Sequence, residues 1–99
     1  MVESVDMVSR VNQAAALLKV LANENRLLIL CHLLEQELSV SVLNKELPLS
    51  QSALSQHLAI LRSNGLVAVR KEAQSVYYSL CSNDVREIIG LLHKLYCEH

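Results

Sequence analysis

The stretch LPLSQSALSQHLAILR, residues 47–62, combines a turn with an amphipathic segment. Leu54, Leu58 and Leu61 recur at helical spacing and form one apolar stripe. The rest of the predicted helix surface carries Gln and Ser side chains, and it has no charge before Arg62. Such side chains both donate and accept hydrogen bonds, so they suit base edges in the DNA major groove. By itself the segment fits either a DNA-reading helix or an ordinary polar surface helix.

A second short helix is predicted just before this one. Ser39 is expected to cap its N-terminus. Pro48 disfavours a helical conformation at Leu47 and so ends this helix. Ser50 can cap the helix that follows. Two short helices joined by a tight turn, the second with a polar face, predict a helix-turn-helix over about residues 39–63.

A β-hairpin is predicted after the second helix. Asn64-Gly65 provides a left-handed stop, and two strand-like runs then flank residues 71–75. This hairpin, or wing, is expected over about residues 66–81, with Arg70 and Lys71 at its tip within reach of DNA phosphates.

Helical patterns also occupy both ends of the chain. Helices are expected over about residues 7–22, 25–35 and 83–97, with a Ser or Asn at 82 or 83 capping the last. The first and last carry apolar arcs too wide for one small domain to cover, which predicts packing across a two-fold axis in a homodimer. The fold class is therefore mainly α with a small β-hairpin wing, a winged helix-turn-helix in the order α-α-α-α-β-β-α, in one domain over residues 1–99.

Composition limits the possible functions. The net charge is −1, and residues 37–74 are basic by a single charge, so any DNA binding must depend on shape and a few phosphate contacts. No apolar run approaches the ~20 residues of a membrane span, and the N-terminus is acidic rather than signal-like. We expect a cytoplasmic protein without membrane contact, whose three cysteines are free, redox-active or metal-binding thiols.

Double-stranded DNA is the partner expected for a helix-turn-helix with this polar face. The predicted contacts lie on the second helix of the helix-turn-helix and on the wing. They are Ser50, Gln51, Ser52, Ser55, Gln56 and His57 toward the bases, with Arg62, Arg70 and Lys71 on phosphates.

From about Ala14 to Cys97 the sequence resembles the ArsR-type winged-helix transcriptional repressors. The matching landmarks are LANENRLLIL at residues 21–30, SALSQHLAILR at 52–62 and GLV at 65–67. The hairpin segment at residues 70–74 and Tyr77 resemble the BigR/HlyU-type branch. The resemblance implies a homodimer that binds operator DNA and is released by reactive sulfur species such as persulfides. It also implies that Cys31 and Cys97 are the sensing pair.

The residues themselves leave the roles of the cysteines open. Cys31 lies on an apolar stripe, where a lone Cys is more often a small buried hydrophobe. Cys97 lies at a helix end beside His93 and Lys94, which favour its thiolate, although the helix dipole opposes ionisation. A persulfide on one thiol can be resolved by the other into a di- or polysulfide. The sequence does not decide which thiol attacks first, and Cys81 has no counterpart in the sensing pair.

Three other functions are compatible with parts of this sequence. A metal-responsive repressor of the same fold would need soft ligands, but Ser39 and Ser41 occupy the family's thiolate positions, and Arg86 stands where the second family site has a His. We therefore expect no metal and no cofactor. An enzyme using Cys97 and His93 lacks a third orienting group, so no catalysis is expected. A dimerisation module without DNA binding is the remaining alternative, favoured by the weak positive charge.

Overall fold

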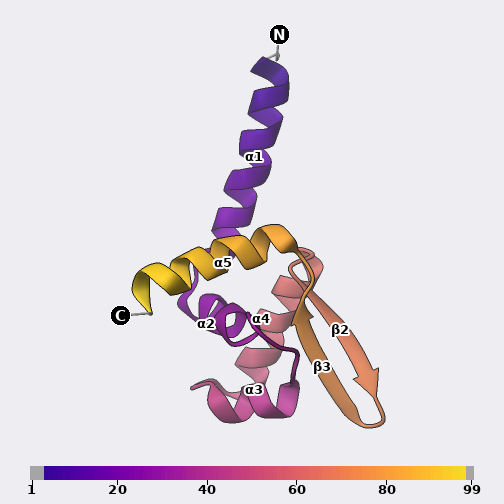
Figure 1. Ribbon diagram of the computed structural model, residues 1–99. Coiled ribbons are helices and arrows are strands. Elements are labelled where there is room, and N and C mark those ends of the chain that lie inside the picture. Colours follow the sequence, from indigo (N-terminus) through magenta and orange to yellow (C-terminus); the bar gives the residue numbers. More distant parts are fainter. Residues whose placement is uncertain (1–3, 98–99) are drawn as a thin grey trace.

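The computed structural model describes residues 4–97, and the fold is mainly helical with a small antiparallel sheet. Figure 1 shows α1 projecting from a body built by the other elements. In chain order the elements are α1 (Ser4–Leu21), α2 (Glu24–His32), β1 (Leu38–Ser39), α3 (Val40–Glu46), α4 (Gln51–Ser63), β2 (Val67–Glu72), β3 (Ser75–Leu80) and α5 (Asn83–Tyr96).

Side-chain caps fix where these helices begin. The hydroxyl of Ser39 accepts a hydrogen bond from the Val42 amide, and that of Ser50 accepts one from the Ala53 amide, so both predicted caps are confirmed. Ser82 caps α5. The second helix was predicted to reach residue 35, which is wrong. It ends at His32 because the chain tightens into a turn there, with the Leu34 amide donating to the Cys31 carbonyl.

The sheet has the strand order β1-β3-β2 and is antiparallel throughout. The two-residue strand β1 was not predicted, because its segment is too short to show alternation and was taken as a connector. The wing tip was also placed too early. Pairing continues to Glu72 and Ser75, so the turn is Ala73-Gln74 and Arg70 and Lys71 lie within β2.

The core forms where α2, α3, α4 and α5 meet the sheet. The predicted stripe of α4 is buried completely or nearly so, with Leu54 and Leu61 at 0 % exposure and Leu58 at 2 %. Leucine, isoleucine and valine fill the remaining space, as expected for a chain without Phe or Trp. The core thus fixes the orientation of α4 and leaves its polar face outward.

Apolar side chains nevertheless remain exposed on α1 and α5, as the sequence predicted. Val11 on α1 is 55 % exposed, and Leu95 and Tyr96 on α5 are 52 % and 74 % exposed. The exposed apolar surface is therefore spread along α1 and the outer face of α5.

No helix within residues 4–97 is long and apolar enough to cross a membrane.

Candidate DNA-binding surface and dithiol pocket

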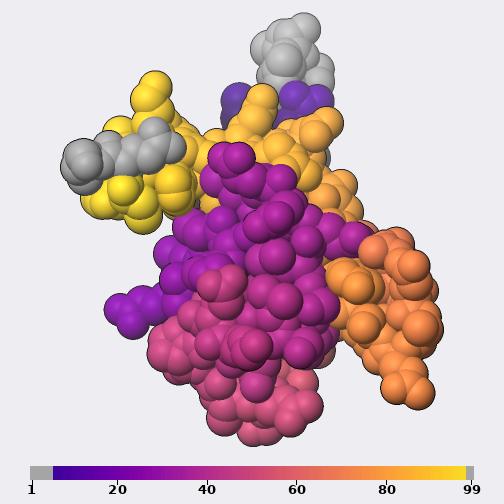
Figure 2. Space-filling view, turned by 60° about the horizontal axis from the view of Figure 1, so that its bottom comes forward, coloured from indigo at the N-terminus to yellow at the C-terminus, as the bar shows by residue number. Residues whose placement is uncertain are grey.

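The predicted reading residues of α4 lie together on one exposed surface. Gln51, Ser52, Ser55 and Gln56 are all exposed along the first two turns. Figure 2 shows α3 and α4 side by side at the lower part of the molecule, with the wing beside them. Ser50 is exposed as well, but its hydroxyl is already engaged, because it accepts from the Ala53 amide and lies 3.3 Å from the Ser52 hydroxyl.

His57 lies differently from its neighbours. Its side chain is half-buried, and its Nδ1 is buried without a hydrogen-bond partner among the described residues. The position follows from the helix, since His57 comes one residue before the buried Leu58 and three after the buried Leu54. A direct base contact by His57 therefore finds no support in its position.

A polar cleft of about 340 Å³ extends this surface toward the wing. It joins the start of α3, the start of α4 and the wing tip. Its walls present hydroxyl and amide groups that can hydrogen-bond to phosphates or base edges. Sequence reasoning missed most of this lining, because serines and amides at these places are also typical of caps and turns. The polar residues that line it are Ser39, Ser41, Asn44, Gln51, Gln74 and Ser75.

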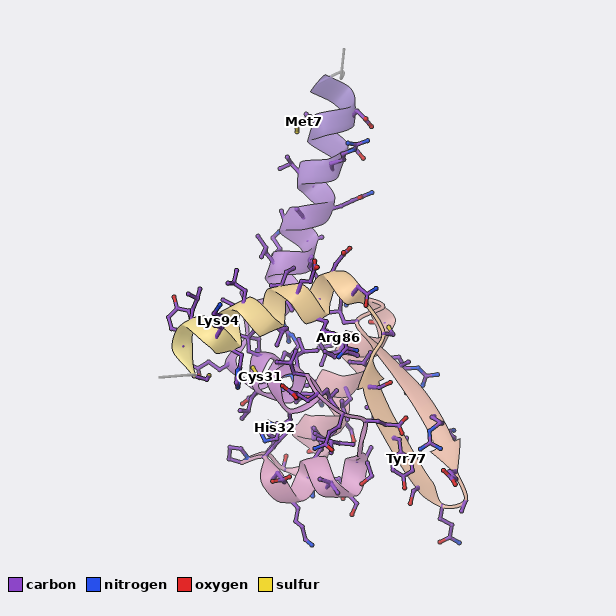
Figure 3. The ribbon with its side chains drawn as sticks, in the orientation of Figure 1. Met7, Cys31, His32, Tyr77, Arg86 and Lys94 are labelled. Carbon is purple, nitrogen blue, oxygen red and sulfur yellow. The ribbon has the colours of Figure 1, made fainter. Side chains whose placement is uncertain are left out.

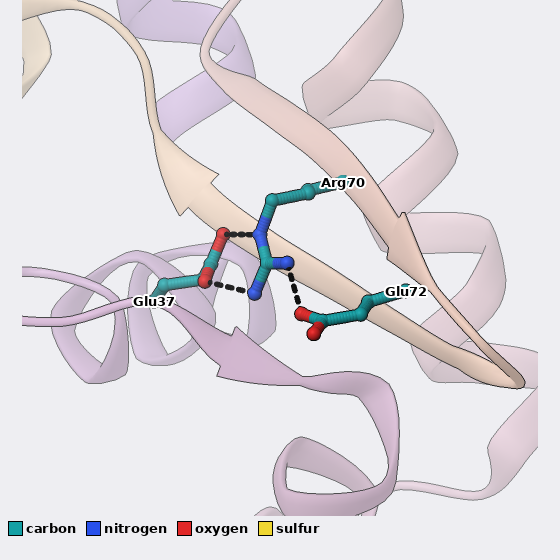
Figure 4. A network of polar contacts seen from close by, with 3 residues as sticks. All are labelled: Glu37, Arg70 and Glu72. Carbon is teal, nitrogen blue, oxygen red and sulfur yellow. Dashed lines mark hydrogen bonds and ion pairs between the residues drawn. The ribbon is translucent and has the colours of Figure 1, made fainter.

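Arg70 is held by carboxylates and does not lie free at the wing tip (Figure 4). Its Nε and Nη2 donate to the two carboxylate oxygens of Glu37 at 3.0 and 2.8 Å, and its Nη1 donates to Glu72. The guanidinium also lies 4.5 Å from the centre of the Tyr77 ring. These hydrogen bonds lower the pKa of Glu37 and raise the pKa of Arg70 above its ordinary value.

This network gives Arg70 a different environment from the free wing-tip cation that was expected. The charge expected at the tip for phosphates is instead compensated by two acidic groups, one of them 33 residues away in sequence. Both side chains of the main pair are partly exposed, at 48 % and 34 %, so solvent screens the pair and it contributes little to stability. Lys71 and Arg62 are exposed, as predicted for phosphate contacts.

The structure brings Cys31 and Cys97 to one pocket. Cys31 lies half-buried on α2, and Cys97 is the exposed C-cap residue of α5. Both line a pocket of about 370 Å³ between these helices, together with Leu27, Leu92 and Tyr96. Burial raises the pKa of the Cys31 thiol, and the negative charge of the Cys97 thiolate raises it further. All three cysteines are free thiols.

Cys81 is separate from this pocket. It lies in the connection between β3 and α5, and its thiol donates to the Gly65 carbonyl at 3.1 Å. It does not line the pocket. A glycine inside a helix, such as Gly90 on α5, can mark a close backbone approach, but within the described residues a Cβ at Gly90 would meet nothing within 4 Å. Any neighbour that packs on Gly90 must therefore come from outside this subunit.

One arginine connects the helices around the pocket to the sheet. Arg86 on α5 donates from Nη1 to the Leu34 carbonyl at 2.7 Å and from Nη2 to the Leu80 carbonyl at 3.4 Å. Figure 3 shows Arg86 and Cys31 in the same region beneath α5. Arg86 thus acts here as a structural hydrogen-bond donor.

Within residues 4–97 there is no group of three or more His, Cys, Asp or Glu that could hold a metal ion.

Known proteins resemble this chain over most of its length. A profile of the family described as "Bacterial regulatory protein, arsR family" matches residues 23–69. The transcriptional activator HlyU of Vibrio cholerae is 62 % identical over 86 residues, covering 87 % of this chain and 80 % of HlyU. The biofilm growth-associated repressor of Xylella fastidiosa is 35 % identical over 92 residues, covering 93 % of this chain and 81 % of the repressor.

Solved structures agree with these similarities. A structure titled reduced HlyU from Vibrio cholerae superposes with a TM-score of 0.89 at 59 % identity, covering 93 % of this chain and 97 % of that one. The repressor BigR of Xylella fastidiosa superposes with a TM-score of 0.86 at 33 % identity, covering 97 % and 95 %. The winged-helix fold and the BigR/HlyU-type resemblance are thereby confirmed, and these relatives are transcriptional regulators rather than enzymes. The chain belongs to the ArsR family of bacterial regulatory proteins.

Proposed function

We propose that this protein is a homodimeric repressor that binds operator DNA and releases it when reactive sulfur bridges Cys31 to Cys97. The observation that carries the proposal is the position of both thiols on the wall of one pocket between α2 and α5. A pair of free thiols on facing elements is the arrangement that a reversible sulfur bridge requires. The reduced state named for the HlyU structure further supports a redox role for the proposed pair.

DNA binding is proposed to use the exposed face of α4 together with the polar cleft. Gln51 belongs to both surfaces, so the helix and the wing tip form one continuous region. The groups available are mostly uncharged, so sequence reading by hydrogen bonds contributes more than phosphate attraction. Arg62 and Lys71 supply the phosphate contacts. The relatives quoted above are named as a transcriptional activator and as repressors, and both names support DNA binding.

The dimer is proposed to form through α1 and α5. These helices carry large exposed apolar side chains, among them Val11, Leu18 and Leu95. Burial of apolar surface is the dominant favourable contribution to most protein–protein association. A two-fold axis through these helices would place two α4 helices for successive half-sites.

The switch chemistry balances with a hydropersulfide as oxidant. One cysteine thiolate takes the outer sulfur of R–S–SH, which forms a cysteine persulfide and releases the thiol R–SH. The second cysteine then attacks the inner sulfur of that persulfide, which forms the disulfide and releases hydrogen sulfide. If both cysteines carry a persulfide, their condensation gives a trisulfide and hydrogen sulfide. Either bridge ties α2 to α5.

A small difference in free energy between the bridged and reduced states is sufficient to release operator DNA. α2 packs against both α4 and α5, so a new restraint between α2 and α5 acts on the element that supports the reading helix. A tenfold loss of operator affinity corresponds to only ~1.4 kcal/mol of difference between the bridged and reduced states.

The test compares cysteine variants before and after persulfide treatment. Cys31→Ser and Cys97→Ser should bind operator DNA like the parent and fail to release it, whereas Cys81→Ser should respond like the parent because it lies outside the pocket. Intact mass should fall by two hydrogens for a disulfide, or rise by the retained sulfur minus two hydrogens. Release that persists in the Cys31→Ser, Cys97→Ser double variant would refute the proposed switch. A promoter fusion measures whether binding represses or activates.

A further inference from the structure

The pocket beside the thiols has walls suited to uncharged molecules. Its volume of about 370 Å³ lies within the range of small-molecule sites. Apolar side chains form most of its surface, including Leu27, Leu28, Leu92 and Tyr96. A ligand seated here exchanges water for hydrocarbon, which favours apolar groups and penalises charged ones.

The charged groups around the pocket also disfavour an anionic ligand. Glu24, in the first turn of α2, is the carboxylate among the described residues that line the pocket. The His93 imidazole also belongs to the lining, and no Lys or Arg within residues 4–97 does. Lys94 follows His93 on α5, but its side chain is exposed and does not line the pocket. An entering anion therefore meets a carboxylate in addition to losing hydration. The same burial disfavours ionisation of Cys31.

We propose that this pocket admits uncharged organic polysulfides with short apolar arms and disfavours anionic sulfur carriers of the same length. This inference rests on the proposed function, because it names the substrate class for the same dithiol. The two thiols on the wall require an electrophilic sulfur atom, and a dialkyl trisulfide supplies one without carrying charge. Its apolar arms fit against the leucine side chains that line the site.

The reaction balances without another oxidant. One cysteine thiolate attacks an outer sulfur of R–S–S–S–R, forming a mixed disulfide with the protein and expelling the persulfide anion, which takes up a proton. The second thiolate attacks the protein sulfur of that mixed disulfide and expels R–S⁻, which is also protonated. Two protein thiols are oxidised to one disulfide, and the trisulfide is reduced to one thiol and one hydropersulfide.

The test uses two probes that share the trisulfide core. Dipropyl trisulfide is uncharged, and bis(2-carboxyethyl) trisulfide carries a carboxylate on each arm. The rate of Cys31–Cys97 bridge formation in the reduced full-length protein is measured by intact mass. Each rate is divided by the rate of the same probe with a small neutral thiol, which removes intrinsic reactivity. We expect the normalised rate to be about tenfold higher for dipropyl trisulfide, equivalent to ~1.4 kcal/mol.

Variants locate the origin of this preference. Glu24→Gln and Glu24→Lys should progressively raise the normalised rate of the dicarboxylate and leave that of dipropyl trisulfide within about twofold. Glu35→Lys is the matched control, because it makes the same charge change at an exposed residue outside the pocket. Thermal melting verifies that each variant is folded.

Two results would overturn the inference. Equal normalised rates for the two probes would show that the pocket does not select by charge, and so would an equal response of Glu24→Lys and Glu35→Lys. Neither result affects the proposed switch. That proposal fails separately if hydropersulfide leaves Cys31 and Cys97 unbridged, or if the bridged protein retains full operator affinity.

Discussion

The wing offers a quantitative test of which cations contact DNA. Arg70 and Lys71 are neighbours on β2, but adjacent strand residues point to opposite faces. Arg70 pairs with Tyr77 and is bound by Glu37 and Glu72. Lys71 pairs with Val76, which lines the polar cleft, so its exposed ammonium lies on the side expected to face DNA.

The expected magnitudes follow from counterion release. Each phosphate neutralised by a cation contributes about 0.9 to the slope of log affinity against log salt. Lys71→Ala should therefore flatten this slope by close to ~0.9 and weaken operator and random DNA alike. Arg70→Ala should leave the slope almost unchanged, because its charge is already compensated within the protein. Glu37→Gln should steepen the slope, since it frees part of the positive charge of Arg70.

Fluorescence anisotropy with labelled operator and random duplexes, titrated at several salt concentrations, measures all these slopes. Circular dichroism melts control for folding of the wing variants. If Arg70→Ala flattened the slope as much as Lys71→Ala, Arg70 would leave its carboxylates for a phosphate on binding. The conclusion that the charge of Arg70 stays compensated by Glu37 and Glu72 would then be wrong.

Further predictions concern reading, reactivity, stability and assembly. Gln56→Ala should weaken operator binding by ~1–3 kcal/mol and leave random DNA nearly unaffected in competition titrations. Because burial raises the pKa of Cys31, its thiolate is scarce near neutrality. If attack by this thiolate limits bridging, the bridging rate measured by quenched alkylation should rise about tenfold for each pH unit. A rate that does not change with pH would exclude the Cys31 thiolate as the limiting nucleophile. Arg86→Met should lower the free energy of unfolding in urea by ~1–3 kcal/mol, whereas Lys94→Met should change it by less than ~0.5 kcal/mol. Val11→Glu should shift sedimentation from dimer toward monomer, because it places a charge in the proposed apolar interface.

Local signals in the sequence were sufficient to predict most of the fold. Leu54, Leu58 and Leu61 identified the buried side of α4 because helical periodicity depends only on neighbouring turns. Ser39 and Ser50 identified helix starts because a capping hydroxyl bonds an amide three residues ahead. The antiparallel wing followed from its two strand-like runs.

Contacts between distant segments were not predictable in this way. β1 became a strand because β3 pairs with it, and its two residues carry no periodic signal of their own. The binding of Arg70 by Glu37 depends on how the α2–β1 connection passes the wing, which no local pattern records. The proposed pairing of Cys31 with Cys97 follows from the family resemblance alone, since the local sequence around each residue is also typical of a structural or incidental Cys. Tertiary structure adds the pocket that they share.

The proposed bridge and the DNA-binding surface are connected through one short segment of chain. Cys31 lies in the last turn of α2, and its carbonyl accepts from the Leu34 amide. The Leu34 carbonyl in turn accepts from Arg86, which also reaches the Leu80 carbonyl at the end of β3. β3 is the central strand, so any displacement there is passed to β1, which leads directly into α3, and to β2 in the wing. A sulfur bridge that displaces the end of α2 therefore acts on both borders of the polar cleft, while the buried stripe of α4 keeps the reading helix in the core.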